Sequence, residues 1–121
     1  MSDATAIARS YLEVWNETDT HRRAELFGRS WHEDARYVDP MMKGEGVAQI
    51  GGLVAAVHER FPGFRFTLRG QPDGHGEHVR FQWSLGPDGQ AAPIEGSDVV
   101  RLDGGRIASV VGFLDKVPAG A

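Results

Sequence analysis

The hydrophobic period changes near Pro62, and this change limits the chain to a fold in which helices precede strands. Upstream of Pro62, apolar residues recur at helical spacing, as in Ile7, Tyr11, Val14 and Trp15. Downstream, apolar residues alternate with polar ones, as in a half-buried strand. Helices followed by strands pack as an α+β fold, so we predict helices that cover one face of a sheet.

The front half predicts three helices and one short strand. Pro40 ends the strand, because proline has no backbone N–H to donate to a neighbouring strand. Pro62 ends the last helix, because proline disfavours helical conformation at the preceding residue. A polar segment after the first helix supplies a cap for the second. In chain order we expect a helix over residues 4–16, a short helix capped by Thr18 or Asp19, a strand over residues 34–39, a loop at 44–46 and a helix over residues 47–61.

The back half predicts four antiparallel strands joined by tight turns. Glycine, proline and aspartate gather where the alternation stops, and these residues favour chain reversal. Long antiparallel strands twist and curl, so three helices can leave part of the concave face uncovered. We therefore expect one domain over residues 1–121, a cone-shaped α+β barrel with an open cavity. The expected turns are residues 71–74, 86–89 and 103–105.

Charge and composition exclude several classes of function. The 121-residue chain has a net charge of −4, which argues against binding to nucleic acid or to an anionic membrane surface. It contains no cysteine, so disulfides and zinc–thiolate sites are excluded. The first residues are polar and no apolar stretch reaches about 18 residues. We therefore expect a cytoplasmic protein.

Aromatic side chains are expected to form the walls of the cavity. Ligand cavities are lined mainly by apolar and aromatic groups with a few polar ones, so a small hydrophobic molecule is the expected partner. The alternative is that these rings fill the core. His58 could face the mouth of the cavity as an acid or base, or be partly exposed. The candidate ligand-binding residues are Trp15, Trp31, His58, Phe61, Phe66, Phe81, Trp83 and Phe113.

Asp98 is the most unusual polar residue of the predicted strands. It shares a strand face with Ile94, Val100 and Leu102, where a lone carboxylate is costly to bury. Asp98 either serves chemistry or pairs with an arginine or a tyrosine. The strand arginines have the opposite parity and are expected to point outward. The five histidines form no ligand pair on one helix, so no metal site is expected.

Three segments resemble the nuclear transport factor 2-like superfamily, and within it the SnoaL-like polyketide cyclases and the ketosteroid isomerases. They are residues 11–19 (YLEVWNETD), 34–40 (DARYVDP) and 96–107 (GSDVVRLDGGRI). The superfamily contains isomerases, cyclases, epoxide hydrolases, dehydratases and noncatalytic binding domains. The resemblance implies a homodimer packed through the outer face of the sheet.

The resemblance also implies a catalytic set of Tyr11, Asp39 and Asp98. These positions match the tyrosine, the aspartate before proline and the late-strand aspartate of ketosteroid isomerases. Asp39 would be the general base, and Tyr11 with a protonated Asp98 would stabilise the enolate oxygen without a cofactor. From the residues alone, a core tyrosine is the more common role for Tyr11, and Asp39 could equally be a turn residue.

Three functions follow as hypotheses. The first is a cofactor-independent isomerase or cyclase that acts on a small hydrophobic carbonyl compound. The extra rings Trp15 and Trp31 favour an enone, lactone or polyketide fragment over a steroid. The second is a noncatalytic ligand-binding or dimeric scaffold domain. The third is water activation by Asp39 and Asp98 beside an arginine, as in related epoxide hydrolases.

Overall fold

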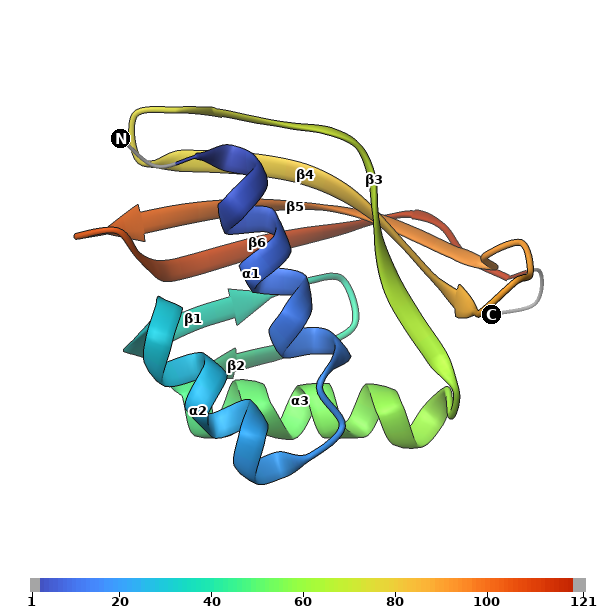
Figure 1. Ribbon diagram of the computed structural model, residues 1–121. Helices are drawn as coiled ribbons and strands as arrows, with labels where there is room; N and C mark the ends of the chain where they lie inside the picture. Colours follow the sequence, from blue (N-terminus) through green and yellow to red (C-terminus); the bar gives the residue numbers. More distant parts are fainter. Residues whose placement is uncertain (1–2, 119–121) are drawn as a thin grey trace.

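The computed structural model describes residues 3–118 as three helices packed on a curved six-stranded sheet (Figure 1). Helix α1 crosses in front of the sheet, and α2 and α3 lie along its lower side. The predicted α+β class is confirmed. The elements are α1 (Ala4–Asn16), α2 (Thr20–Ser30), β1 (Trp31–Val38), β2 (Lys43–Glu45), α3 (Val47–Arg60), β3 (Phe64–His75), β4 (His78–Pro87), β5 (Ile94–Asp103) and β6 (Arg106–Lys116).

Aspartate caps begin the first two helices. The carboxylate of Asp3 accepts the backbone N–H of Thr5, and that of Asp19 accepts the N–H of His21. Such caps satisfy donors that have no partner inside the helix. The predicted start of α2 and the bounds of α1 are thus confirmed. The buried side of α1 turns Tyr11 and Trp15 toward the sheet, one helical turn apart.

The sheet is mixed and open. Its strand order is β2-β1-β6-β5-β4-β3, and only β1 and β6 run parallel. Strands β2 and β3 are the two edge strands and are not paired with each other, so the curved sheet does not close into a barrel. The pairing of β1 with β6 brings the end of β1 beside the middle of β6. This parallel contact joins the helical half of the chain to the strand-rich half.

Three expectations about the strands were wrong. The strand expected over residues 34–39 is β1, which begins at Trp31 and ends at Val38. Residues 43–45 form the short strand β2 on β1 rather than a loop. The turn expected at residues 71–74 lies instead at Gly76 and Glu77, because β3 continues through Pro72 to His75. Strand β3 is an edge strand with a register shift between Arg69 and Asp73. An edge strand or bulge tolerates proline, since no ladder partner needs its missing N–H.

The core lies between the helices and the concave face of the sheet. Inward and outward residues alternate along the strands: on β4, Val79, Phe81 and Trp83 are buried, whereas Arg80 and Gln82 are exposed. The strand arginines expected to point outward, including Arg80, are exposed as predicted. No helix within residues 3–118 is long and apolar enough to cross a membrane. The cytoplasmic location stays a prediction.

Candidate functional site

A cavity of about 500 Å³ opens between α1, α3 and the concave face of the sheet. Its inner part contains Tyr11 and Asp98, each 2% exposed, and its outer part contains Met41, which is 71% exposed. Most of the lining is apolar, and the ionisable side chains are Tyr11, Tyr37, Asp39, Arg60 and Asp98. The remaining lining residues are Leu12, Trp15, Met41, Met42, Ala56, Val57, Phe61, Phe66, Trp83, Leu85, Ile94, Leu114, Val117 and Pro118.

Asp98 lies in the middle of β5, facing the cavity side of the sheet. Its strand neighbours are Phe81 on β4 and Gly112 on β6. Oδ2 of Asp98 accepts the indole N–H of Trp83 at 3.1 Å. Oδ1 is buried and has no hydrogen-bond partner among residues 3–118. A buried carboxyl with one free oxygen is costly unless the group is neutral or meets a ligand.

The environment of Asp98 favours its neutral form. Burial is the main cause, and it raises the pKa of this carboxyl to about 7. Contacts with Tyr11 and Trp83 lower this pKa, whereas the negative charge of Asp39 raises it. The Trp83 contact has full hydrogen-bond geometry, and the approach of Tyr11 falls short of it. Asp98 is therefore protonated in a large fraction of molecules near neutral pH.

Asp39 follows β1 directly and is held by three donors. The backbone N–H groups of Met41 and Met42 donate to its Oδ1 at 2.7 and 2.9 Å. The Tyr37 hydroxyl donates to its Oδ2 at 2.6 Å. The turn interpretation of Asp39 is thus correct as far as its backbone contacts go. The same contacts fix the side chain at the cavity, which Asp39 also lines.

Two tyrosines line the cavity together with the two carboxyls. Tyr11 comes from α1 and Tyr37 from β1, and both are buried. Burial, followed by the negative charge of Asp98, raises the pKa of both hydroxyls above the ordinary tyrosine value. Both phenols therefore keep their protons at physiological pH. The Tyr37 hydroxyl donates its proton to Asp39, and the Tyr11 hydroxyl retains one to donate to a ligand.

Gly112 makes room for this group of side chains. A Cβ atom at position 112 would lie 2.6 Å from Oδ1 of Asp98, 3.2 Å from Cβ of Asp39 and 3.5 Å from the Tyr37 hydroxyl. All three groups therefore converge on one point of β6. The register explains this, because Asp98 pairs with Gly112, and Tyr37 pairs with Val110 two residues earlier.

A stack of three rings forms one wall of the cavity. Phe66 lies between Trp15 and Trp83, with ring centroids 5.6 and 5.2 Å apart and nearly parallel planes. Each face of Phe66 is covered by one of its two neighbours, so the stack presents aromatic edges to the cavity. Phe61 also lines the cavity. These four of the sequence-derived ligand-binding candidates are lining residues.

Four other candidates lie outside the lining. Trp31 borders a separate groove between α2 and α3, because it begins β1 on the side of these helices. The imidazole Nε2 of His58 is 2.7 Å from the Trp15 carbonyl oxygen and so packs onto α1. Phe81 packs edge-on against the inner ring of Tyr11. Phe113 is 53% exposed on the outer face, because inward parity on β6 falls on Val110, Gly112 and Leu114.

Tyr37 is the functional candidate that sequence reasoning missed. It lies two residues before Asp39, so strand parity places both side chains on the same face of the sheet. The alternation of the predicted strand is therefore the signal that identifies Tyr37. Arg60 was also missed as a lining residue. It lies in the last turn of α3, with its guanidinium 5.5 Å from the Phe61 ring centroid.

The described residues contain no cluster of three or more histidine and acidic side chains that could hold a metal ion. The ionisable groups of the cavity are instead two carboxyls, two phenols and one guanidinium. Arg60 is exposed, whereas Asp98 is buried. The arrangement suits proton transfer by carboxyl groups in a largely apolar environment.

The family model of the SnoaL-like domain matches residues 8–110. The chain belongs to the SnoaL-like family. The resemblance seen in the sequence is therefore confirmed, and it suggests isomerase or cyclase chemistry for this SnoaL-like protein. No curated protein matches the chain significantly.

Solved structures support the family and the fold. A SnoaL-like family protein from Agrobacterium tumefaciens, proposed to be an isomerase, shares 48% identity at a TM-score of 0.90, over 95% of this chain and 99% of that one. A proposed ketosteroid isomerase from Kribbella flavida shares 20% identity at a TM-score of 0.70, over 98% of this chain and 82% of that one. A proposed SnoaL-like polyketide cyclase from Jannaschia shares 18% identity at a TM-score of 0.71, over 95% of this chain and 90% of that one. The last two show the fold alone.

Proposed function

We propose that this SnoaL-like protein is a cofactor-independent isomerase or cyclase that removes a proton from the carbon next to a carbonyl group. The observation that supports this most is the convergence of Asp39, Asp98 and Tyr37 on Gly112 at an apolar cavity. Asp39 is a carboxylate surrounded by donors, whereas burial favours the neutral form of Asp98. Two carboxyls in different environments suit opposite roles as base and acid.

Asp39 is the base of the proposed reaction. Oδ1 already accepts two backbone N–H groups, while Oδ2 accepts only the Tyr37 hydroxyl. Oδ2 therefore keeps a lone pair that can take the proton from the substrate carbon. The electrons of the broken C–H bond move into the carbonyl and form an enolate.

Tyr11 and neutral Asp98 are the donors to the enolate oxygen. Both lie in the buried part of the cavity, and donors at an apolar site stabilise developing negative charge more than donors in water. In an isomerisation, Asp39 returns the proton to a different carbon of the conjugated system. In a cyclisation, the enolate carbon attacks a second carbonyl of the same molecule; the π bond of that carbonyl opens, and the resulting alkoxide takes the proton held by Asp39.

The cavity fits a compact flat substrate. Its volume of about 500 Å³ lies within the usual range of roughly 300–1,000 Å³ for ligand sites. The stack of Trp15, Phe66 and Trp83 presents ring edges, which can pack edge-to-face on a flat conjugated ring. An enone, a lactone or a small polyketide fragment has these properties.

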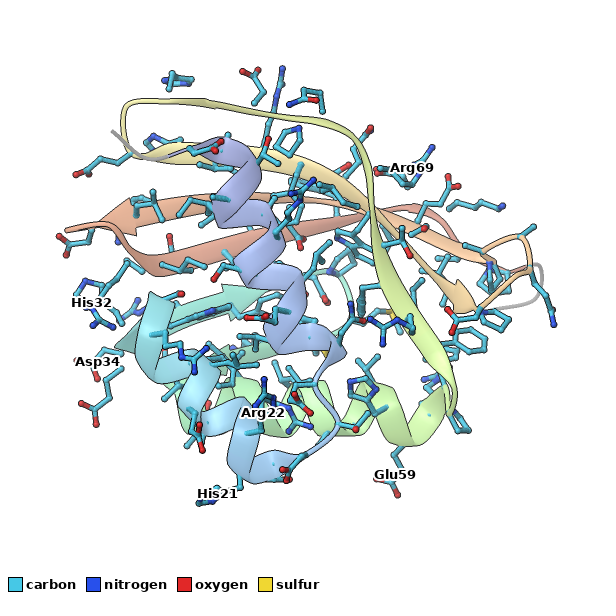
Figure 2. The ribbon with its side chains drawn as sticks, in the orientation of Figure 1. His21, Arg22, His32, Asp34, Glu59 and Arg69 are labelled. Atoms are coloured by element: carbon cyan, nitrogen blue, oxygen red, sulfur yellow. The ribbon has the colours of Figure 1, made fainter. Side chains whose placement is uncertain are left out.

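The experiment uses 3-cyclohexen-1-one, whose conversion to the conjugated 2-cyclohexen-1-one raises ultraviolet absorbance. We expect the wild type to accelerate this conversion and Asp39→Asn to lower the rate by at least about 100-fold, the usual contribution of a positioned base. Asparagine keeps an oxygen for the two backbone donors, so the fold should survive. Asp34→Asn is the matched control, because Asp34 is an exposed acid of β1 that points away from the body of the protein (Figure 2).

Equal rates in wild type and Asp39→Asn would refute the assignment of the base. Binding of the ketone without turnover would favour the noncatalytic alternative. Hydration of an epoxide probe that depends on both carboxyls would favour water activation, with Arg60 as the arginine that lines the cavity.

We also propose that the protein is a homodimer through the outer face of its sheet. Val38, Val111 and Val99 lie side by side across β1, β6 and β5, and each is at least 37% exposed. Phe113, two residues along β6, extends this apolar strip. Exposed apolar strips of this kind commonly mark protein–protein contacts. Sedimentation should give twice the chain mass of 13.2 kDa, and Val111→Asp should halve it. A monomeric wild type would exclude the dimer.

A further inference from the structure

We propose that Trp83 is a positioning residue for Asp98: its indole N–H occupies Oδ2, which confines the acidic proton to Oδ1, on the side of Asp39 and Tyr37. This inference rests on the proposed function, in which neutral Asp98 donates a hydrogen bond to the enolate oxygen. Without such a contact, the proton of a neutral carboxyl can reside on either oxygen.

The hydrogen bond itself determines where the proton lies. The Trp83 indole is a donor only, and it meets Oδ2 of Asp98 at 3.1 Å in a buried environment. In a neutral carboxyl, the oxygen without the proton is the better acceptor. A donor fixed at Oδ2 therefore leaves the proton on Oδ1. Within the described part of the chain, Oδ1 has no partner of its own.

The Trp83 ring has little freedom to leave this position. A Cβ atom at residue 96 would lie 2.2 Å from the Trp83 ring, so the ring rests directly on the backbone of Gly96 in the neighbouring strand. The other face of the ring stacks on Phe66 at 5.2 Å. The indole N–H is thus held by packing from both sides.

The orientation of Asp98 matches its proposed role. Oδ1 approaches the backbone at Gly112, on the same side as Asp39 and the Tyr37 hydroxyl. A proton on Oδ1 therefore points toward the region where the substrate would meet the base. Rotation of the carboxyl by half a turn would instead bring the proton against the indole N–H, where two donors oppose each other.

The first experiment observes the indole N–H groups by proton–nitrogen NMR across the titration of Asp98. The chain has three tryptophans, and Trp83→Phe and Trp31→Phe assign two of the signals by their loss. We expect the Trp83 N–H signal to keep the chemical shift of a hydrogen-bonded indole both below and above the titration midpoint of Asp98. A Trp83 signal that moves to a free position when Asp98 becomes protonated would overturn the inference.

The second experiment compares the two phenylalanine variants in the cyclohexenone assay. Trp31 is the control, because it is also buried, has an unpartnered indole N–H among the residues described and lies outside the cavity lining. Its ring stacks on Tyr11, and phenylalanine keeps an aromatic ring in that place. We expect Trp83→Phe to lower kcat by about tenfold, the effect of one hydrogen bond. The hydrogen bond from Trp83 lowers the pKa of Asp98. Its loss should therefore shift the alkaline limb of the pH–rate profile to higher pH.

The two proposals fail in different ways. Equal kcat values and pH profiles for Trp83→Phe and Trp31→Phe would remove Trp83 from the mechanism. A wild type that converts no cyclohexenone would refute the proposed function on this probe. The NMR titration would still decide the role of Trp83, since it needs no substrate.

Discussion

Replacement of Asp98 by asparagine should remove a specific dependence of stability on pH. Burial raises the pKa of Asp98 from 3.8 to about 7. Because the folded-state pKa is the higher one, the folded protein binds the proton more tightly than the unfolded chain. The stabilising contribution is complete below pH 3.8 and is lost as pH rises through 7.

The size of this effect follows from the pKa difference. At about 1.4 kcal/mol per pKa unit, ionisation of Asp98 costs the folded state about 4 kcal/mol in total. Asp98 is 2% exposed, so solvent screening reduces this value little. About 2 to 3 kcal/mol of the change should fall between about pH 5 and 8, where most surface acids no longer titrate.

The assay is urea unfolding of wild type and Asp98→Asn at several pH values. Other ionisable groups contribute equally to both proteins, so the difference between the two free energies of unfolding isolates Asp98. The wild type should lose about 2 to 3 kcal/mol relative to Asp98→Asn as pH rises from about 5 to 8. A difference that stays constant over this range would show that Asp98 ionises like a surface acid.

Three further substitutions, with Gly52→Ala as a control, test the packing around the site. Gly112→Ala would place Cβ 2.6 Å from Oδ1 of Asp98; we expect a loss of about 1–3 kcal/mol in urea unfolding and a lower isomerisation rate, and an unchanged rate would contradict the convergence on Gly112. In Gly96→Ala the new Cβ would lie 2.2 Å from the Trp83 ring, so this change should be at least as destabilising. Gly52→Ala lies in open space within α3 and should stabilise the protein by about 0.5–1 kcal/mol. A Gly96→Ala protein more stable than Gly52→Ala would argue against the position of the Trp83 ring. Tyr37→Phe removes the 2.6 Å bond to Asp39 and should lower thermal stability by the equivalent of about 1 kcal/mol, and an unchanged melting temperature would indicate that this bond contributes little.

The fold followed from local patterns in the sequence. The helical spacing of Tyr11 and Trp15 and the Asp19 cap gave α1 and the start of α2. Strand β2 was missed because three residues with two nearby glycines carry little periodic signal, and its pairing with β1 is a tertiary contact. The extent of β3 was missed because proline and glycine favour turns locally, while the edge position that tolerates them is a property of the whole sheet.

The site was predictable in part. The inward parity of Asp98 and the match of Asp39 could be derived from β-strand alternation and from the family pattern. The contacts of Trp83 with Asp98 and Gly96 depend on the register of β4 against β5, which the sequence does not specify. Phe113 was assigned to the wrong face because β6 alternates weakly, with apolar residues on both sides.

A crystal structure with bound 2-naphthol, a flat aromatic alcohol that mimics an enol, would test the central claim most directly. We predict that its hydroxyl lies within hydrogen-bond distance of Tyr11 and Oδ1 of Asp98, with the ring along Phe66 and Trp83. The carbon next to the hydroxyl-bearing carbon should face Oδ2 of Asp39. A naphthol bound in the groove between α2 and α3, or with its hydroxyl turned outward to Arg60, would contradict the account.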